Sequence, residues 1–422
     1  MNPLRTRRAA RLTRTALVAS SVAALTVTAT VTTATAQDRQ PRPSVALDWY
    51  DTTAAGIAAA GAPTQITNSR TWAISWLAAA RATRTVPHGV DRADFQDAAL
   101  ASAVHDSLSA LIPARTRQFD AALATTLDRI QDGAAETRGV EAGARQAALV
   151  LASRERDGLD PASVDAPFPV PDAAPGVWQP TPPAHAPAAQ YGNRLARPFL
   201  LARADQYRLP APPALTSERY RNDLAEVRAY GAVNSTVRTP RQTETADFWF
   251  GPSPTLYTEP LRVALARSPR SAAARARLVA LFHVALVDTQ IATSDSKYAY
   301  LRWRPVTAIR TGAIDPDPGW TPLHTTPAHP DYPSGHGTYA GAAQTVLTAF
   351  TGPRTAPFEL TSPTAPGVVR TYTAWSQLSK DNVDARVYSG IHTRSADEAG
   401  VILGERVAAH TLRTAERLFG DL

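Results

Sequence analysis

The stretch HPDYPSGHGT at residues 329–338 is the part of the sequence around which the rest is interpreted. It combines the start of a helix with residues that suit the binding of an anion. Pro333 ends an extended approach, Ser334 can cap a helix, and Gly335 lets a ligand come close to the backbone. Small and apolar residues from 339 to 350 predict the helix itself. Its free N–H groups and the positive end of its dipole would face a ligand over Ser334 and Gly335, and an oxyanion suits that position.

A pair of cationic residues precedes this stretch. Lys297 and Arg304 lie seven positions apart in a helix predicted from about 272 to 304, and Pro305 ends that helix. Seven positions are almost two helical turns, so both side chains are expected on one face. Among aromatic neighbours they suit a buried tetrahedral oxyanion, and a solvated basic face is the alternative.

A third segment follows the stretch and contains Arg386 and His392. On one continuous helix these two would point about a third of a turn apart, so Ser389 and Gly390 are expected to break the helix and let both point inward. A structural histidine is the alternative for His392. The three segments together supply positive charge, hydrogen-bond donors and proton-transfer groups, namely Lys297, Arg304, Arg386, Ser334, Gly335, His336 and His392.

The chain as a whole predicts an all-α fold. Its 422 residues are 44% hydrophobic and include no cysteine, so disulfides and thiolate metal sites are excluded. Apolar residues recur at helical spacing, as at Leu100, Val104 and Leu108, and no alternating strand pattern of useful length is found. The region Thr351–Pro366 is expected to be a loop. The predicted domains are a helical bundle at 37–160, a Pro-rich wrap or linker at 161–215, and a helical catalytic domain at 216–422.

The first 36 residues predict a secretory signal peptide. Five arginines precede an apolar run from about Ala16 to Val31, and small residues at 34–36 suit cleavage. A membrane anchor is the alternative. We therefore expect a secreted protein without stable membrane insertion, since no second long apolar span follows directly.

The net charge of +7 does not indicate a nucleic-acid partner. Removal of the leader leaves 39 basic and 37 acidic residues, a net charge of +2. The charges are scattered rather than gathered in a stripe. No nucleic-acid binding is expected.

The three segments share their order and spacing with a known superfamily. Lys-x6-Arg-Pro, Pro-Ser-Gly-His and Arg-x5-His resemble the motifs of the vanadium-dependent haloperoxidases and phosphatidic acid phosphatases. The segments at 234–243, 332–336 and 366–371 are most similar to the fungal chloroperoxidases of the haloperoxidase branch. The resemblance implies helical bundles of the acid phosphatase and vanadium-dependent haloperoxidase type.

The resemblance also implies roles for the site residues. His392 would bond the vanadium of bound vanadate, and His336 would handle protons. The remaining residues would hold the oxygens of vanadate or phosphate, namely Lys297, Arg304, Ser334, Gly335 and Arg386.

Four positions depart from the family pattern. Ser294 stands where the chloroperoxidases have tryptophan, and His329 stands where they have phenylalanine and the algal bromoperoxidases have histidine. His329 is therefore a candidate on the halide side of the site. No aspartate follows Trp249 to orient His336, and Asp295 or Glu244 are the substitutes considered. The aspartate expected four residues after His392 is displaced to Asp397.

Three functions are compatible with this sequence. The first is a haloperoxidase that uses vanadate and hydrogen peroxide to oxidise a halide, bromide or iodide rather than chloride. The second is a metal-free acid phosphatase that hydrolyses a phosphate ester through a phosphohistidine on the same scaffold. The third is an inactive helical binding protein, suggested by the missing aspartate.

Overall fold

The computed structural model describes residues 44–61, 64–268 and 271–420. All of these ranges belong to one compact unit. They form 14 α-helices and one two-stranded sheet, so the all-α prediction is confirmed. The predicted signal peptide at 1–36 lies outside the described residues, and both secretion and the predicted domain boundaries stay predictions.

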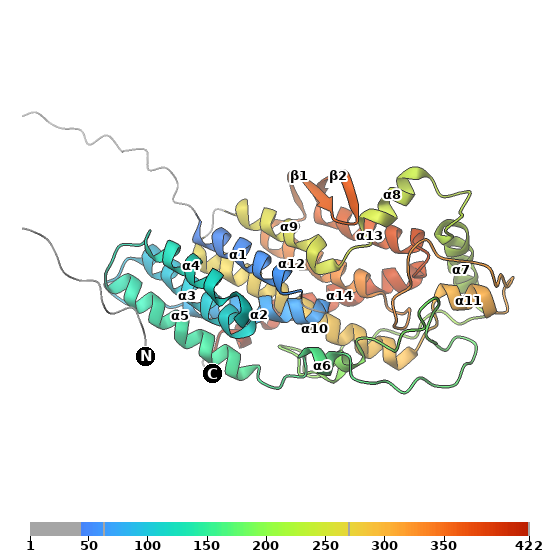
Figure 1. Cartoon of the computed structure of the whole chain (residues 1–422), viewed down its shortest axis with the longest axis horizontal. Helices are drawn as coiled ribbons and strands as arrows, with labels where there is room; N and C mark the ends of the chain where they lie inside the picture. Colours follow the sequence, from blue (N-terminus) through green and yellow to red (C-terminus); the bar gives the residue numbers. More distant parts are fainter. Residues whose placement is uncertain (1–43, 62–63, 269–270, 421–422) are drawn as a thin grey trace, which may run out of the picture. The chain divides into compact units, whose positions relative to one another are not determined.

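Five helices from the first third of the chain pack together at one end of this unit (Figure 1). Leu100, Val104 and Leu108 are fully buried, which is the outcome their helical spacing predicts. Ser44 and Asp91 cap two of the helices by accepting backbone N–H groups. The five are α1 (Val45–Ala60), α2 (Gln65–Ala82), α3 (Arg92–Leu111), α4 (Thr116–Leu127) and α5 (Ala134–Ser153).

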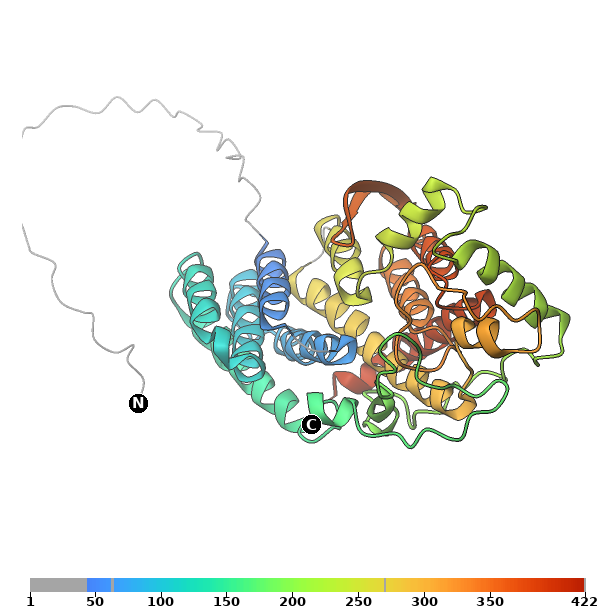
Figure 2. The same cartoon turned by 45° about the vertical axis from the view of Figure 1, so that its right-hand side comes forward.

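Helix α10 (Ala272–Tyr300) is the central element of the core. It packs against α2 on one side and against α12 (Gly335–Thr351) and α14 (Arg394–Thr414) on the other (Figure 2). Every residue from 278 to 287 is buried. Among the described helices α10 alone is long and apolar enough to cross a membrane, but 89% of its most apolar window is buried inside this fold, as in a core helix.

The Pro-rich segment after α5 contains the short helix α6 (Pro161–Val164) and a 3₁₀ turn at Tyr191–Leu195, and is otherwise irregular. Trp178 is fully buried, and its backbone N–H donates to the carbonyl of Leu301 at 2.6 Å. The segment therefore packs along the end of α10.

Short helices and a hairpin complete the part of the chain around α12 and α14. Ser217 caps α7 and Thr239 forms a capping box with Gln242. The remaining helices are α7 (Glu218–Gly231), α8 (Pro240–Phe248), α9 (Ser253–Ala266), α11 (Pro305–Thr311) and α13 (Trp375–Tyr388).

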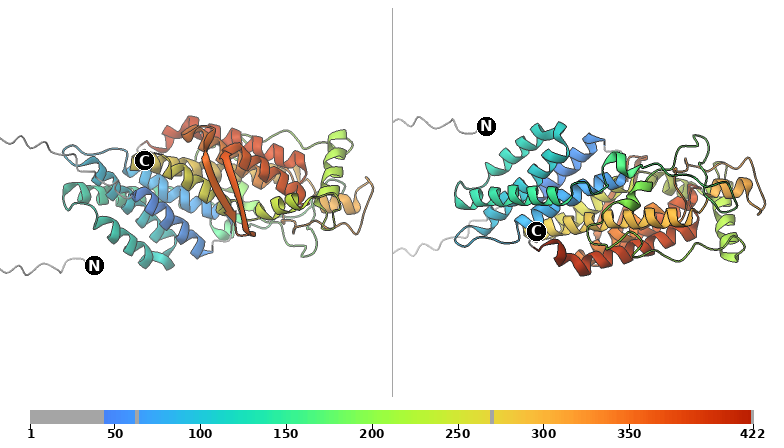
Figure 3. Two further views of the ribbon diagram at one scale, coloured as in Figure 1. Left: turned by 90° about the horizontal axis from the view of Figure 1, so that it is seen from above. Right: turned by 90° about the horizontal axis from the view of Figure 1, so that it is seen from below.

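The prediction of a loop at Thr351–Pro366 and of no strands is wrong. Strands β1 (Arg354–Ser362) and β2 (Ala365–Ala374) form an antiparallel hairpin, which lies beside α9, α12 and α13 (Figure 3). Phe358 and Leu360 are buried and alternate with exposed residues. Prolines obscure this short alternation, and a two-stranded sheet tolerates them because both of its strands are edges.

The predicted helix from 272 to 304 is also too long. Helix α10 ends at Tyr300, because Leu301 adopts a left-handed conformation with φ 47°. Arg304 lies beyond this turn as the N-cap residue of α11. Lys297 and Arg304 therefore do not share a helix face, and the chain reversal after Tyr300 brings them together instead.

Helices α12 and α14 approach each other closely through glycines. A Cβ atom added at Gly404 would lie 2.0 Å from the carbonyl oxygen of Thr338, and one at Gly341 would lie 2.1 Å from that of Val401. This contact fixes α12 against α14. At the site, the backbone N–H of Ser334 donates to the carbonyl of Ala396 in the first turn of α14 at 2.9 Å.

Candidate anion-binding site

The start of α12 forms the floor of the site. The Ser334 side chain accepts the backbone N–H of Gly337 at 3.3 Å, so Ser334 caps the helix as predicted. The space over Gly335 is open, because an added Cβ would meet no atom within 4 Å. The first N–H groups of a helix point outward without intrahelical partners. An anion placed over Gly335 would meet these groups and the positive end of the helix dipole.

Arg304 is fully buried and joins all three segments. Its Nε donates to the carbonyl of His329 at 2.6 Å, and its Nη1 donates to the carbonyl of Ile391 at 2.6 Å. Nη1 also lies 3.0 Å from Nε2 of His392, and Nη2 lies 2.9 Å from Nδ1 of His329. Burial lowers the pKa of Arg304 to about 10, so the guanidinium remains charged at neutral pH.

Lys297 and Arg386 complete the positive charge. Nζ of Lys297 donates to the carbonyl of Pro330 at 2.5 Å, and burial followed by the charge of Arg304 lowers the pKa of Lys297 well below its usual value. Arg386 is 1% exposed and makes one long hydrogen bond, 3.4 Å to the carbonyl of Trp249. Its Nε is buried and has no partner among the described residues. A buried donor without a partner is costly, and an oxyanion would satisfy it.

Three histidines border these cations. Nε2 of His336 lies 3.1 Å from the carbonyl of Gly251, while Nδ1 of His392 lies 2.6 Å from Oδ1 of Asp331. His329 is 9% exposed and contacts Arg304 as described above. Burial lowers the pKa of all three rings well below 6.5, so each is neutral at neutral pH. The structure thus brings together every site residue that the sequence predicts.

The substitutes considered as carboxylate partners of His336 are wrong. Asp295 pairs with Arg208 at 2.7 Å and with Arg194 at 3.0 Å. Glu244 pairs with Arg370 at 3.1 Å. The carbonyl of Gly251 takes the place of a carboxylate instead, because the chain turns directly after Trp249 and directs this carbonyl at the ring.

Asp331 is the functional residue that the sequence prediction missed. It lies inside the opening stretch, two positions after His329, and its carboxylate is 0% exposed. Its bond to His392 spans 61 positions of sequence. The available indication was an acidic side chain between two prolines in a segment expected to be buried.

Asp397 lies on the first turn of α14 and is fully buried. Neither of its oxygens accepts a hydrogen bond of regular geometry from a described residue. Burial raises the pKa of Asp397 well above its usual value. Within the described residues it forms no hydrogen bond to His392, so the displaced aspartate is not the partner of that ring.

The comparisons with known proteins agree with these motifs. Residues 277–421 match the family described as the VCPO second helical-bundle domain. Vanadium chloroperoxidase of Curvularia inaequalis is 28% identical over 283 residues, 50% of this chain and 46% of that protein, so the match spans about half the length of this relative.

Solved structures share the fold. The first bacterial vanadium-dependent iodoperoxidase has a TM-score of 0.74 at 22% identity, with 87% of this chain and 96% of that chain covered. The holo form of a bacterial vanadium-dependent chloroperoxidase has a TM-score of 0.67 at 16% identity, with 86% and 96% covered. In its matched bundle domain, its sequence and its helical fold, the chain is thus similar to vanadium haloperoxidases.

Proposed function

We propose that this protein is a vanadate-dependent haloperoxidase that oxidises a halide with hydrogen peroxide. The observation that carries the proposal is the gathering of three buried cations around the His392 ring, together with a helix start that leaves open space over Gly335. Similarity to vanadium haloperoxidases supports it at the level of the family.

The donor set suits vanadate. Lys297, Arg304 and Arg386 would neutralise its charge, while Ser334 and the backbone at Gly335 would donate hydrogen bonds. Nε2 of His392 would be the single protein atom bonded to the metal. Bound vanadate would supply an electron-poor centre that activates peroxide toward halide without a change of oxidation state.

His336 is placed to move protons. Its Nε2 faces the Gly251 carbonyl, which can only accept, so Nε2 carries the hydrogen in the neutral ring. Nδ1 is then the basic atom. A neutral imidazole can take a proton from peroxide and later return one to the departing oxygen. The carbonyl orients the ring without adding negative charge, unlike a carboxylate.

We propose bromide or iodide as the halide. His329 is neutral, and Nδ1 faces an Arg304 donor, so Nε2 carries the ring hydrogen and can donate to an anion. Ser294 replaces a tryptophan of the chloroperoxidases, and its hydroxyl donates to the carbonyl of Gln190 at 2.7 Å. The similarity of the fold to an iodoperoxidase is consistent with this choice.

An acid phosphatase is the second candidate, and the His392–Asp331 pair favours it. A neutral imidazole with a carboxylate on Nδ1 is a suitable nucleophile toward phosphorus through Nε2. The same cations would stabilise the transition state, and His336 would protonate the leaving oxygen.

A paired assay distinguishes the two activities. Purified protein is tested with vanadate, peroxide and bromide, and in parallel with an aryl phosphate without vanadate. The proposal predicts bromide oxidation that requires added vanadate and is competed by phosphate. Aryl phosphate hydrolysis inhibited by vanadate, together with no bromide oxidation, would establish the phosphatase instead. Absence of both activities would favour a binding protein.

A further inference from the structure

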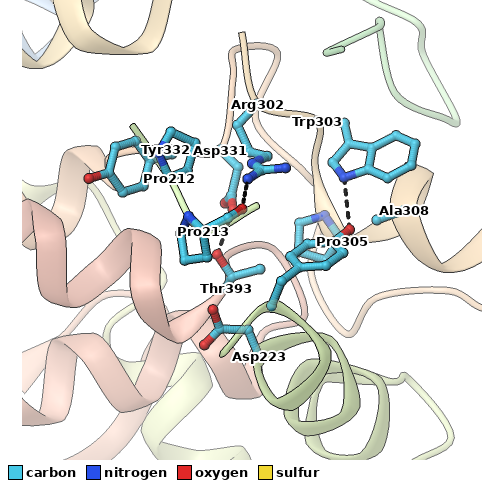
Figure 4. A pocket seen from close by; sticks show the side chains of 11 residues that line it. Pro212, Pro213, Asp223, Arg302, Trp303, Pro305, Ala308, Asp331, Tyr332 and Thr393 are labelled. Carbon is cyan, nitrogen blue, oxygen red and sulfur yellow. Dashed lines mark hydrogen bonds between the residues drawn. The ribbon is translucent and has the colours of Figure 1, made fainter. Parts of the chain in front are cut away.

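Asp331 occupies a position that connects the three segments of the site. Its carboxylate Oδ1 lies 2.6 Å from Nδ1 of His392, and its Oδ2 accepts the hydroxyl of Thr393 at 2.8 Å (Figure 4). The backbone N–H of Asp331 donates to the carbonyl of Arg302 at 2.9 Å, and its own carbonyl accepts from Lys297 at 3.2 Å. Both ends of the residue are therefore fixed.

The carboxylate has no arginine or lysine as a direct ion-pair partner among the described residues. The nearby Arg302 guanidinium donates to the carbonyl of Pro213 instead (Figure 4). The nearby charges of Arg304 and Lys297 and the hydrogen bonds from His392 and Thr393 compensate the buried carboxylate. Each of these hydrogen bonds is strong, because the acceptor is ionised and the surroundings are buried, where electrostatic interactions are weakened little by water.

These contacts determine which ring nitrogen of His392 carries the hydrogen. An ionised carboxylate can only accept, so Nδ1 must be the donor in the neutral ring. Nη1 of Arg304 lies 3.0 Å from Nε2 and 3.4 Å from Nδ1, so it lies over the ring and leaves the lone pair of Nε2 free to bond an electrophile. The contact with Asp331 is therefore what selects the tautomer.

We propose that Asp331 is a positioning residue that holds His392 in the Nδ1–H tautomer and so makes Nε2 the bonding atom of the site. This inference rests on the proposed function in one respect, because it assumes that the ligand bonded to Nε2 is an oxyanion. It assigns the carboxylate partner to the segment before Ser334, whereas the sequence pattern placed it after His392, at Asp397.

The surroundings of the carboxylate protect this hydrogen bond from water. A cavity of about 10 Å³ adjoins Asp331 and Thr393 and is also lined by Asp223 and Arg302 (Figure 4). Such a volume holds about one water molecule. Asp331 is 0% exposed and His392 is 1% exposed, so bulk water does not reach the bond between them.

The wild-type protein itself provides the first test. Histidine-selective ¹⁵N labelling and two-dimensional NMR of the anion-free protein report the tautomer of each ring, and a His392→Gln variant assigns the resonance. We expect His392 as the Nδ1–H form at pH 7.5. A ring in the Nε2–H form would overturn the proposal, and this result needs no variant of Asp331 to fold.

The second test is Asp331→Asn, which keeps the shape and removes the charge. Outer partners of metal-bound histidines typically contribute 10- to 100-fold to affinity, so binding of vanadate should weaken by about that factor. The His392 resonance should also lose its Nδ1–H character. Unchanged affinity with an unchanged tautomer would overturn the proposal.

Asp223→Asn is the matched control, since Asp223 is a buried aspartate on the same cavity without a contact to His392. It should change neither the tautomer nor the affinity for vanadate. A loss of affinity equal to that of Asp331→Asn would show a general effect of the cavity and contradict the proposal. Bromide oxidation is measured in a separate assay. The protein could therefore lack this activity and still have the proposed tautomer, or oxidise bromide with the other tautomer.

Discussion

The three buried cations of the site are held by carbonyl oxygens rather than by carboxylates. Lys297 donates to Pro330, Arg304 to His329 and Ile391, and Arg386 to Trp249. Among the described residues none of the three forms a direct ion pair with a carboxylate, and the buried Asp331 and Asp397 act on them only from a longer range. The cations therefore remain available to an oxyanion. The motifs predicted these residues, but their carbonyl partners could not be predicted because carbonyls carry no sequence pattern.

The two arginines should differ when each is replaced by glutamine. Among the described residues Arg386 makes a single long hydrogen bond, so Arg386→Gln should weaken orthophosphate binding by about 10-fold or more with little loss of stability. Arg304→Gln would leave buried carbonyls without a donor, at roughly 1–3 kcal/mol each, so stability should fall as well. Calorimetric titration and urea unfolding measure the two effects. Equal losses of stability would contradict this division of roles.

His283 should make stability depend on pH. Its ring is 5% exposed, is stacked on Trp72 with centroids 4.8 Å apart, and has no hydrogen-bond partner among the described residues. Burial lowers the pKa of His283 from 6.5 to about 3. Between these values the unfolded chain binds a proton that the folded chain does not, so the free energy of unfolding falls as the pH is lowered.

The expected loss between pH 7.5 and pH 5 is about 2 kcal/mol from this ring alone. The contribution of His283 is obtained by measuring the free energy of unfolding in urea for the wild type and for His283→Phe at both pH values. Contributions from other groups are the same in both proteins and cancel in the comparison. The variant should lose less stability on acidification. The same loss in both proteins would exclude His283 as the cause.

At the scale of elements, helix starts were predicted better than helix ends. A side-chain cap such as Ser334 is local, so the sequence suffices to place it. The end of α10 depends on Leu301 in a left-handed conformation, which apolar periodicity does not indicate. The hairpin at 354–374 was missed because its prolines resemble those of a loop.

The break between α13 and α14 was predicted from Ser389 and Gly390 and is confirmed, since the helices end at Tyr388 and begin at Arg394. Gly390 has φ 76°, and an added Cβ would lie 2.4 Å from the carbonyl oxygen of Gly231. The turn sets the directions of the site residues on either side. It therefore needs glycine for both its conformation and its close contact.

Gly390→Ala should lower stability by more than the roughly 1–2 kcal/mol that a left-handed alanine costs, and should also weaken orthophosphate binding. Gly352→Ala is the control, because Gly352 has φ 84° but an added Cβ there meets no atom within 4 Å. It should show the conformational cost alone. Thermal unfolding measures the stability of the two variants, and calorimetric titration measures their affinity for orthophosphate. Equal losses in both variants would argue against a role for the close contact at Gly390.

At the scale of the whole molecule, long-range pairs complete what local motifs begin. Arg208 reaches Asp295 across 87 positions, and His392 reaches Asp331 across 61. Such pairs depend on how the irregular segment and the helices pack, so a single sequence does not reveal them. The all-α class and the gathering of the motif residues were predictable, since both follow from helical periodicity and ordered motifs.

The irregular segment before α7 should stabilise the region around Lys297. Trp178 is fully buried beside Tyr298, the residue after Lys297. Trp178→Ala should cost about 3–5 kcal/mol in the free energy of unfolding. Leu195→Ala in the same segment, where the side chain is 66% exposed, should stay within about 0.5 kcal/mol. Similar values for both variants would indicate that the segment contributes little to stability.

The central claim is that vanadate held against Nε2 of His392 makes this protein a peroxidase. The most direct test measures the rate of bromide oxidation by peroxide as vanadate is added to anion-free wild type and to His392→Ala. We expect a rate that saturates at one vanadate per chain in the wild type and stays at background in the variant. Oxidation independent of vanadate, or full activity in His392→Ala, would contradict the claim.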